Sequence, residues 1–138
     1  MSSNTDAAVV ASVVPSHQRS AFLPSHLGRH TIIGEALVFG WLDRLCIDYN
    51  GGMWDFYSLS NGGFYMAPID KKPFKIDVPT NGFSGEMSAD AAGIVASLFA
   101  LCDLANRAGE DKMINQYHWL RDFAIEHAES RLIMGAID

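Results

Sequence analysis

Ser84 and the two cysteines are the residues that could act as nucleophiles. Gly82 stands two residues before Ser84, as in the nucleophile turn of α/β-hydrolases, but that turn also needs a glycine two residues after the serine, where Glu86 stands. Cys46 and Cys102 fall on apolar helical patterns, where a buried thiol is unreactive. We therefore expect no catalytic residue and predict that the protein is not an enzyme.

The histidines and glycines do not indicate a metal or phosphate site. No Cys-x-x-Cys motif occurs. His26 and His30 are four residues apart, but Gly28 between them and Pro24 just before them disfavour a regular helix that would present both. A phosphate-binding loop leads from a strand into a helix, whereas the glycine pairs 51–52 and 62–63 lead from turns into predicted strands. We expect neither a metal nor a cofactor.

One pair of carboxylates could support acid–base chemistry. Glu86 and Asp90 are four residues apart, with Ser88 between them. Ser88 is a good helix N-cap, and an acidic residue in the first turn of a helix is favoured by the helix dipole. Capping therefore explains Asp90, and a ligand-binding role of the pair remains the alternative.

Helices are predicted before and after the middle of the chain. A short helix over 16–23 should end at Pro24, because the residue before a proline avoids the helical conformation. The segment 31–46 predicts a helix with one apolar stripe at Ile32, Ala36, Phe39 and Cys46. It is apolar on more than one side, which indicates that other elements bury it. Further amphipathic patterns predict helices over 89–108, with Gly109 as the stop, over 110–127, and over 128–137.

The middle of the chain changes to the pattern of strands. Short aromatic or β-branched runs occupy 53–59, 64–67 and 74–78, and 83–87 is a shorter fourth candidate. Asn61-Gly62 and Asn81-Gly82 separate neighbouring runs and predict type I′ hairpin turns. We therefore predict an α+β fold, in which a small antiparallel β-meander of three or four strands packs with four or five helices.

Length and charge limit the functions of the chain. Its 138 residues fit a single domain at 17–138 behind a flexible N-terminal tail at 1–16. The 10 basic and 16 acidic residues give a net charge of −6. A protein about 30 Å long that imitated duplex DNA would need on the order of 15 to 20 negative charges on one side. The charge therefore disfavours a DNA mimic, which would need most of the 16 acidic residues on one elongated face. The short basic cluster around Lys72 does not indicate nucleic-acid binding.

The sequence also indicates where in the cell the protein acts. The apolar stretches are shorter than the roughly 20 residues that cross a bilayer, so we expect no membrane association. The N-terminus lacks the positive charges of an export signal. Two cysteines do not make a disulfide framework, which favours a reducing cytoplasm. We expect a cytoplasmic monomer.

Two regions carry side chains that a partner could recognise. The predicted strands around 54–65 place aromatic residues on both faces, which either stiffen a covered sheet or form a protein-binding patch. Asp43 lies on an apolar stripe, so it either pairs with Arg44 or another neighbour or faces a partner. Trp119 lies off the apolar stripe of its helix, so it is either exposed or covered by a final helix. The candidate partner-binding residues are Asp43, Arg44, Tyr49, Trp54, Glu86, Asp90, Trp119 and Asp138.

Several long strings of the sequence are similar to one protein family. They are Arg19 with 22–24, then 41–46, 49–68, 81–94, 120–124 and 136–138, and they cover most of the chain after the predicted tail. On these strings the sequence resembles the antirestriction family of the ArdB/KlcA type. The central strings are specific, whereas the C-terminal ones alone would not be.

This resemblance implies an α+β fold peculiar to the family and protection of incoming plasmid or phage DNA from host type I restriction systems. It implies no cofactor, metal or catalytic centre. The partner would be the host type I restriction complex or a factor linked to it, reached by protein contact or indirectly and not by imitating DNA. The alternative is a small ligand-binding or enzymatic domain that uses the aromatic strands with Glu86 or Asp90.

Overall fold

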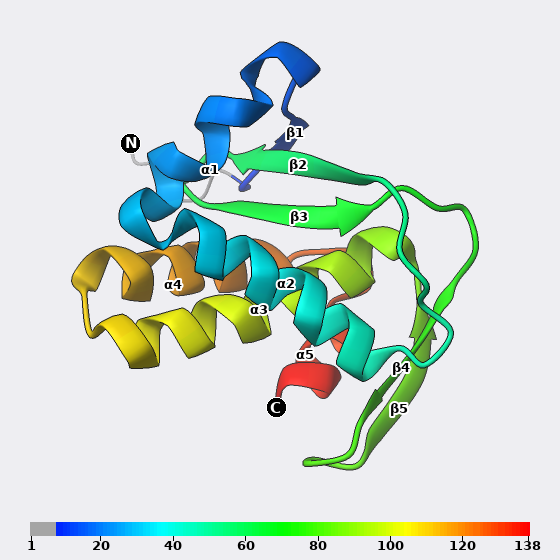
Figure 1. The fold of residues 1–138 in the computed structure, drawn as a ribbon. Helices are drawn as coiled ribbons and strands as arrows, with labels where there is room; N and C mark the ends of the chain where they lie inside the picture. The colour runs from blue at the N-terminus through cyan, green and yellow to red at the C-terminus, as the bar shows by residue number, and fades with distance from the viewer. Residues whose placement is uncertain (1–7) are drawn as a thin grey trace.

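The computed structural model describes residues 8–138, and Figure 1 shows how their helices and strands are arranged. Two short 3₁₀ turns, Ser16–Gln18 and Gly28–His30, flank the first α-helix. The elements in chain order are β1 (Ala11–Val13), α1 (Arg19–Leu27), α2 (Thr31–Leu45), β2 (Trp54–Leu59), β3 (Phe64–Pro68), β4 (Phe74–Val78), β5 (Phe83–Met87), α3 (Ala89–Ala108), α4 (Asp111–Ile125) and α5 (Ser130–Ile137). The predicted α+β class is confirmed.

Helix α3 is the centre of the core. It packs against α2, α4, α5 and β3, and most of its side chains are buried. The Ser88 side chain accepts a hydrogen bond from the N–H of Ala91 at its start, and Gly109 ends it in the left-handed conformation. By length and composition α3 could cross a membrane, but 67% of its apolar window is buried within the protein. Its apolar character therefore serves the core.

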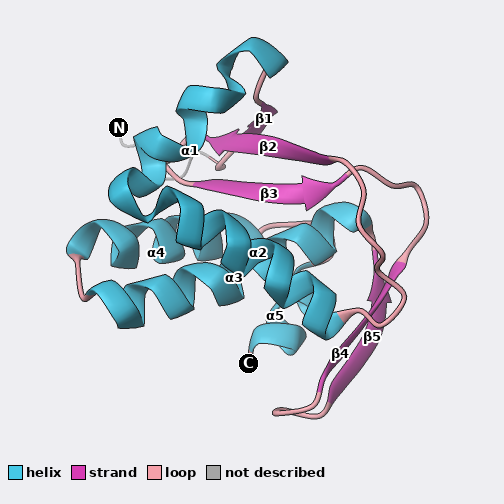
Figure 2. Cartoon of the chain, in the orientation of Figure 1, coloured by secondary structure: helices cyan, strands magenta, loops and turns pink. Residues whose placement is uncertain are grey.

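The strands form two separate antiparallel sheets and not the single predicted meander. One sheet has the order β1-β2-β3, and β4 and β5 form a two-stranded hairpin, as Figure 2 shows in magenta. The free edge of β3 faces α3, where Ser97 Oγ accepts from the Met66 N–H at 3.2 Å and donates to the Met66 carbonyl at 3.3 Å. Since α3 occupies this edge, β4 does not pair with β3.

The prediction of a flexible tail at 1–16 is wrong for residues 11–13, which form β1. Residues 11–13 pair antiparallel with residues 57–59 of β2, and the N–H of Val14 donates to the carbonyl of Phe56 at 2.8 Å. Val14 is buried in the core. Alternating small and β-branched residues allow this segment to complete the sheet edge. Residues 1–7 of the predicted tail lie outside the described residues.

The first helix does not end at Pro24 as predicted. Helix α1 runs through Pro24 to Leu27. Leu23 and Leu27 are both buried, so packing of the last turn outweighs the local preference of the residue before proline. The hydroxyl of Ser25 and the ring of His26 contact the carbonyl of Phe22, which supports the backbone around the proline.

Helix α2 buries a different face from the predicted one. The buried residues are Gly34, Val38, Leu42 and Leu45, whereas Ile32 on the predicted stripe is 83% exposed. The helix is apolar nearly all round, so its sequence pattern does not select the inward side. Close packing selects it, because Gly34 lies directly against Leu27 and Leu104.

The two hairpin turns are not of type I′. Within residues 8–138 only glycines have a positive φ, so Asn61 and Asn81 cannot be the first central residue of such a turn. Instead, each asparagine accepts a backbone N–H within its own turn and donates from Nδ2 to a helix. Asn61 Nδ2 donates to the Trp119 carbonyl of α4, and Asn81 Nδ2 donates to the Ala136 carbonyl of α5, each at 2.9 Å.

The close approach of α3 to β3 gives a direct test of this packing. A Cβ on Gly93 would overlap the backbone of Ala67 and the Met66 carbonyl oxygen. We predict that Gly93→Ala lowers the free energy of unfolding by about 2–3 kcal/mol or more, because backbone cannot move aside without displacing the sheet. Urea denaturation measures the change.

The matched control is Gly40→Ala on the neighbouring helix α2. A Cβ on Gly40 meets no atom within 4 Å, so this variant should gain about 0.5–1 kcal/mol from helix propensity alone. Equal stabilities of the two variants would contradict the α3–β3 packing.

Candidate functional site

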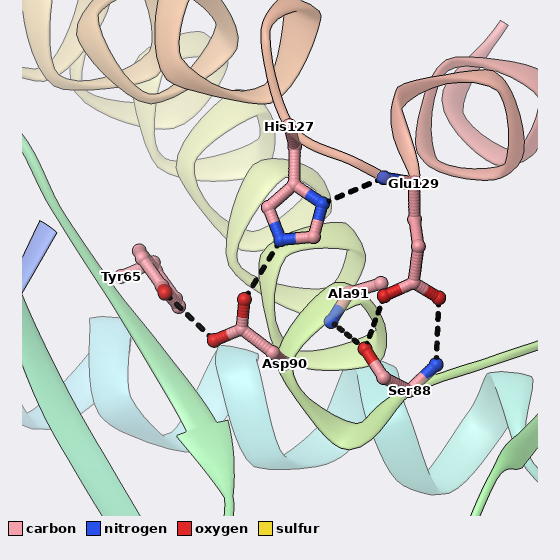
Figure 3. A network of polar contacts seen from close by, with 6 residues as sticks. All are labelled: Tyr65, Ser88, Asp90, Ala91, His127 and Glu129. Atoms are coloured by element: carbon pink, nitrogen blue, oxygen red, sulfur yellow. Dashed lines mark hydrogen bonds and ion pairs between the residues drawn. The ribbon is translucent and has the colours of Figure 1, made fainter. Parts of the chain in front are cut away.

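Asp90 is the centre of a polar network that joins β3, α3 and the turn between α4 and α5 (Figure 3). The Tyr65 hydroxyl donates to Asp90 Oδ1 at 2.7 Å, and His127 Nε2 donates to Asp90 Oδ2 at 2.8 Å. The backbone N–H of Glu129 donates to His127 Nδ1 at 2.9 Å. Because Nδ1 accepts this hydrogen bond, the ring proton of His127 lies on Nε2, which faces Asp90.

Glu129 extends this network to the start of α3. Its carboxylate accepts the Ser88 backbone N–H at 2.9 Å and the Ser88 hydroxyl through its other oxygen. The same hydroxyl accepts the N–H of Ala91 as the helix cap. The N-termini of α3 and α5 are therefore linked through one carboxylate, which is favoured there by both helix dipoles.

The protonation states in the network indicate a structural role. Burial alone would raise the pKa of Asp90, but the hydrogen bonds from His127 and Tyr65 outweigh it and hold this pKa below its usual value. Burial and the neighbouring Asp90 raise the pKa of Tyr65, so its hydroxyl stays protonated. Both ring nitrogens of His127 are already bonded. The network offers no free base to a substrate.

A second polar region is the loop pocket, which we define as the hollow of about 380 Å³ lined by residues of 46–53 and 68–75 and by Glu86. Its charged side chains are of both signs, and Ile47, Met53 and Ile69 in the same loops are exposed. Asp90 does not line it. The structure therefore does not bring Glu86 and Asp90 into one site.

A hydrogen bond between Tyr49 and Trp54 connects the lining of the loop pocket to the core. Trp54 is buried, and its indole Nε1 donates to the Tyr49 hydroxyl at 2.8 Å. The rings of Trp54 and Phe39 of α2 also form a T-shaped pair with centroids 5.0 Å apart. Tyr49 lines the pocket, whereas Trp54 contributes to the core.

The aromatic strand residues favour the first of the two alternatives, a covered and stiffened sheet. Phe56, Phe64 and Tyr65 are buried. Tyr57 is half-buried and stacks on Tyr65, and Tyr65 stacks on Phe123 of α4, with centroids 4.6 and 5.6 Å apart. Helix α4 therefore covers this face, and the strands present no aromatic patch.

Asp43 and Arg44 are both exposed near the end of α2, and the predicted pair is wrong. No ion pair joins them among residues 8–138. Successive residues of a helix point about 100° apart, which separates their side chains. The Arg44 guanidinium instead lies 4.2 Å from the ring centroid of Trp41. This contact was not predicted, although Trp41 stands three residues before Arg44 on the same helix.

Trp119 and Asp138 lie away from these regions. Trp119 is half-buried, and the glycines of the β2–β3 turn pack on its ring. Asp138 is exposed and follows α5.

Sequence reasoning also missed the ion pair between Arg19 Nη2 and Asp55 Oδ1 at 2.5 Å, because the two residues lie far apart in the chain. Among the described residues, no cluster of three metal-ligating side chains is found.

Comparison with known proteins places this arrangement in a family. The sequence profile of the family described as "Antirestriction protein" matches residues 47–138, which include the Asp90 network and the lining of the loop pocket except Cys46. The chain belongs to the antirestriction family. The antirestriction protein KlcA of Escherichia coli is 53% identical over 94% of this chain and 94% of its own length. The resemblance seen in the sequence is confirmed.

Other family members extend the comparison. The putative antirestriction protein YubI of Escherichia coli strain K12 is 32% identical over 87% of this chain and 89% of its own length. A solved structure is 52% identical, with a TM-score of 0.88 over 94% of this chain and 95% of that chain. The work on that structure describes KlcA and ArdB as having a novel fold and antirestriction activity against type I DNA restriction systems in vivo but not in vitro.

The Asp90 network predicts a particular dependence of stability on pH. We expect Asp90→Asn to lower the free energy of unfolding near pH 7 by about 1–2 kcal/mol, the range of hydrogen bonds to a charged group. The pKa of Asp90 is lower in the folded state, so its contribution is present above the unfolded value of 3.8 and is lost as the pH falls through the lower folded value.

The difference in unfolding free energy between the native chain and Asp90→Asn should therefore shrink below about pH 4. Tyr65→Phe removes one donor to Asp90 and should show part of the same pH dependence. A difference that stays constant from pH 7 to pH 3 would contradict the assignment of Asp90 as the ionised centre.

Proposed function

We propose that this antirestriction-family protein protects incoming plasmid or phage DNA from host type I restriction systems in vivo, by protein contact or indirectly. The observation that carries the proposal is the 53% identity to KlcA over nearly the full length of both chains. The close structural match to a relative described with this activity supports it. No enzymatic step is needed, since the Asp90 network offers no free catalytic base.

The charge distribution supports action without imitating DNA. The net charge is −6, and several acidic residues are engaged with cations of the chain itself. Glu110 pairs with Arg29, and Asp103 pairs with Arg107 one helical turn later. An array of phosphate-like charges would need these carboxylates free and aligned on one face. We propose that the acidity serves solubility and that shape and a few contacts give specificity.

The partner is the restriction complex or a host factor linked to it. Activity in vivo without activity in vitro, as described for the solved relative, favours a factor that purified reactions lack. Of the candidate residues, Asp43, Arg44, Glu86 and Asp138 are exposed and available for contact. We propose that Trp54, Asp90 and Trp119 support the fold and that Tyr49 shapes the loop pocket. The chain would act as a cytoplasmic monomer.

The proposal is tested by plating unmodified phage on a host with a type I system, with and without expression of the protein. We expect expression to raise the plating efficiency toward that of a non-restricting host. A non-restricting host that expresses the protein in the same way controls for effects on phage growth. Unchanged restriction at a confirmed level of soluble protein would overturn the proposed function.

A restriction reaction with purified components distinguishes a DNA mimic from a protein that acts by contact or indirectly. A DNA mimic would inhibit a purified type I enzyme in competition with DNA, with inhibition that weakens steeply as salt rises. We expect no such inhibition by the purified protein. Salt-sensitive competitive inhibition would support a mimic and contradict this mechanism.

A further inference from the structure

Gly40 stands at an exposed position in the interior of α2 for which the fold gives no reason. A Cβ at this position would meet no atom within 4 Å, and its backbone φ is not positive. Glycine is among the least favourable residues in the interior of a helix. Packing explains Gly34 on the buried face of the same helix, but no contact within residues 8–138 explains Gly40. A glycine here lets another backbone approach the helix closely.

The surroundings of Gly40 form an open apolar groove. We define the α2 groove by its lining residues, which are Ile33, Ala36, Leu37, Gly40, Trp41 and Arg44, around a volume of about 320 Å³. Ala36 lies one turn before Gly40 and is also exposed. Ile33 is 51% exposed at one end of the groove, and Ile32 beside it is almost fully exposed. Aliphatic side chains beside the small residues Ala36 and Gly40 form a surface against which another helix can pack closely.

Arg44 at the other end of the α2 groove indicates the charge of the occupant. Its guanidinium rests on Trp41, and Trp41 stacks on Phe99 of α3 with ring centroids 4.6 Å apart. No carboxylate of residues 8–138 pairs with Arg44. Stacking on Trp41 restricts the planar guanidinium of Arg44. A guanidinium held in this way can donate two parallel hydrogen bonds to one carboxylate. Tryptophan and arginine are also the residues enriched where partners bind most strongly.

We propose that the α2 groove is the surface through which this protein docks on its protein target, and that the occupant is an amphipathic helix of that target. Aliphatic side chains of this helix would fill the space between Ile33 and Trp41, its backbone would cross at Gly40, and one of its carboxylates would bind Arg44. This inference rests on the proposed function and names the partner surface that the function requires.

The test is the plating assay with two variants, Gly40→Leu and Arg44→Glu. Leucine at position 40 fills the groove and favours the helix, so the melting temperature should rise by about 2–4 °C while protection falls roughly tenfold or more. Arg44→Glu repels the carboxylate and should lower protection by a similar factor. The matched controls are Asn115→Leu on α4 and Arg131→Glu on α5, exposed positions that should keep full protection.

The outcomes separate the docking surface from the proposed function. Protection by the native chain that is retained in folded Gly40→Leu would overturn the groove alone, whereas absence of protection by the native chain would overturn both proposals. Retained protection in folded Arg44→Glu would overturn the carboxylate contact. If sedimentation shows a dimer that Gly40→Leu converts to monomer, the occupant is a second copy and the partner helix is overturned. Loss of protection in the controls to the same extent would also count against the groove.

Discussion

The contact between α3 and β3 is the constraint on which the rest of this fold depends. Gly93 allows the helix to approach the backbone of residues 66–67, and Ser97 then replaces a neighbouring strand by bonding to both polar groups of Met66. Buried backbone groups at a sheet edge need partners, and here a helix side chain supplies them. The β1-β2-β3 sheet therefore ends at β3, and β4 and β5 must form their own hairpin.

The remaining elements are held around this pair by specific polar links. Asn61 and Asn81 join the two hairpin turns to carbonyls of α4 and α5. The network of Asp90, His127 and Glu129 joins the start of α3 to the turn before α5. Asp90, His127 and Glu129 are therefore engaged within the fold. We propose that these side chains support the architecture and that recognition uses the exposed face of α2.

The sequence predicted the elements of this fold better than their arrangement. Strong period changes and the Ser88 and Gly109 caps located the strands and α3, because these signals are local. The inward face of α2 was missed, since Ile32 and Val38 are equally apolar and only contact with Leu27 and Leu104 distinguishes Gly34. The separation into two sheets was missed for the same reason, because the role of Ser97 exists only once α3 meets β3.

The candidate site was predictable only in part. Exposure of Asp43 and Arg44 was one of two alternatives, and the Trp41 contact of Arg44 follows from helical spacing once the inward face is known. Asp90 and Trp54 were selected for their chemistry, but their partners His127 and Tyr49 give them structural roles. Residue type alone does not distinguish a carboxylate that links helices from one that faces a partner.

We propose that this protein acts by shape and local contact and not by imitation of DNA. The most direct measurement is phage protection by a variant in which three scattered exposed acids are neutralised together, Asp48→Asn, Asp122→Asn and Glu126→Gln. This change reduces the net negative charge from −6 to −3 and leaves the α2 groove intact. We predict protection equal to that of the native chain. Loss of protection in the folded variant would show that the negative charge itself is needed and would contradict action by shape and local contact.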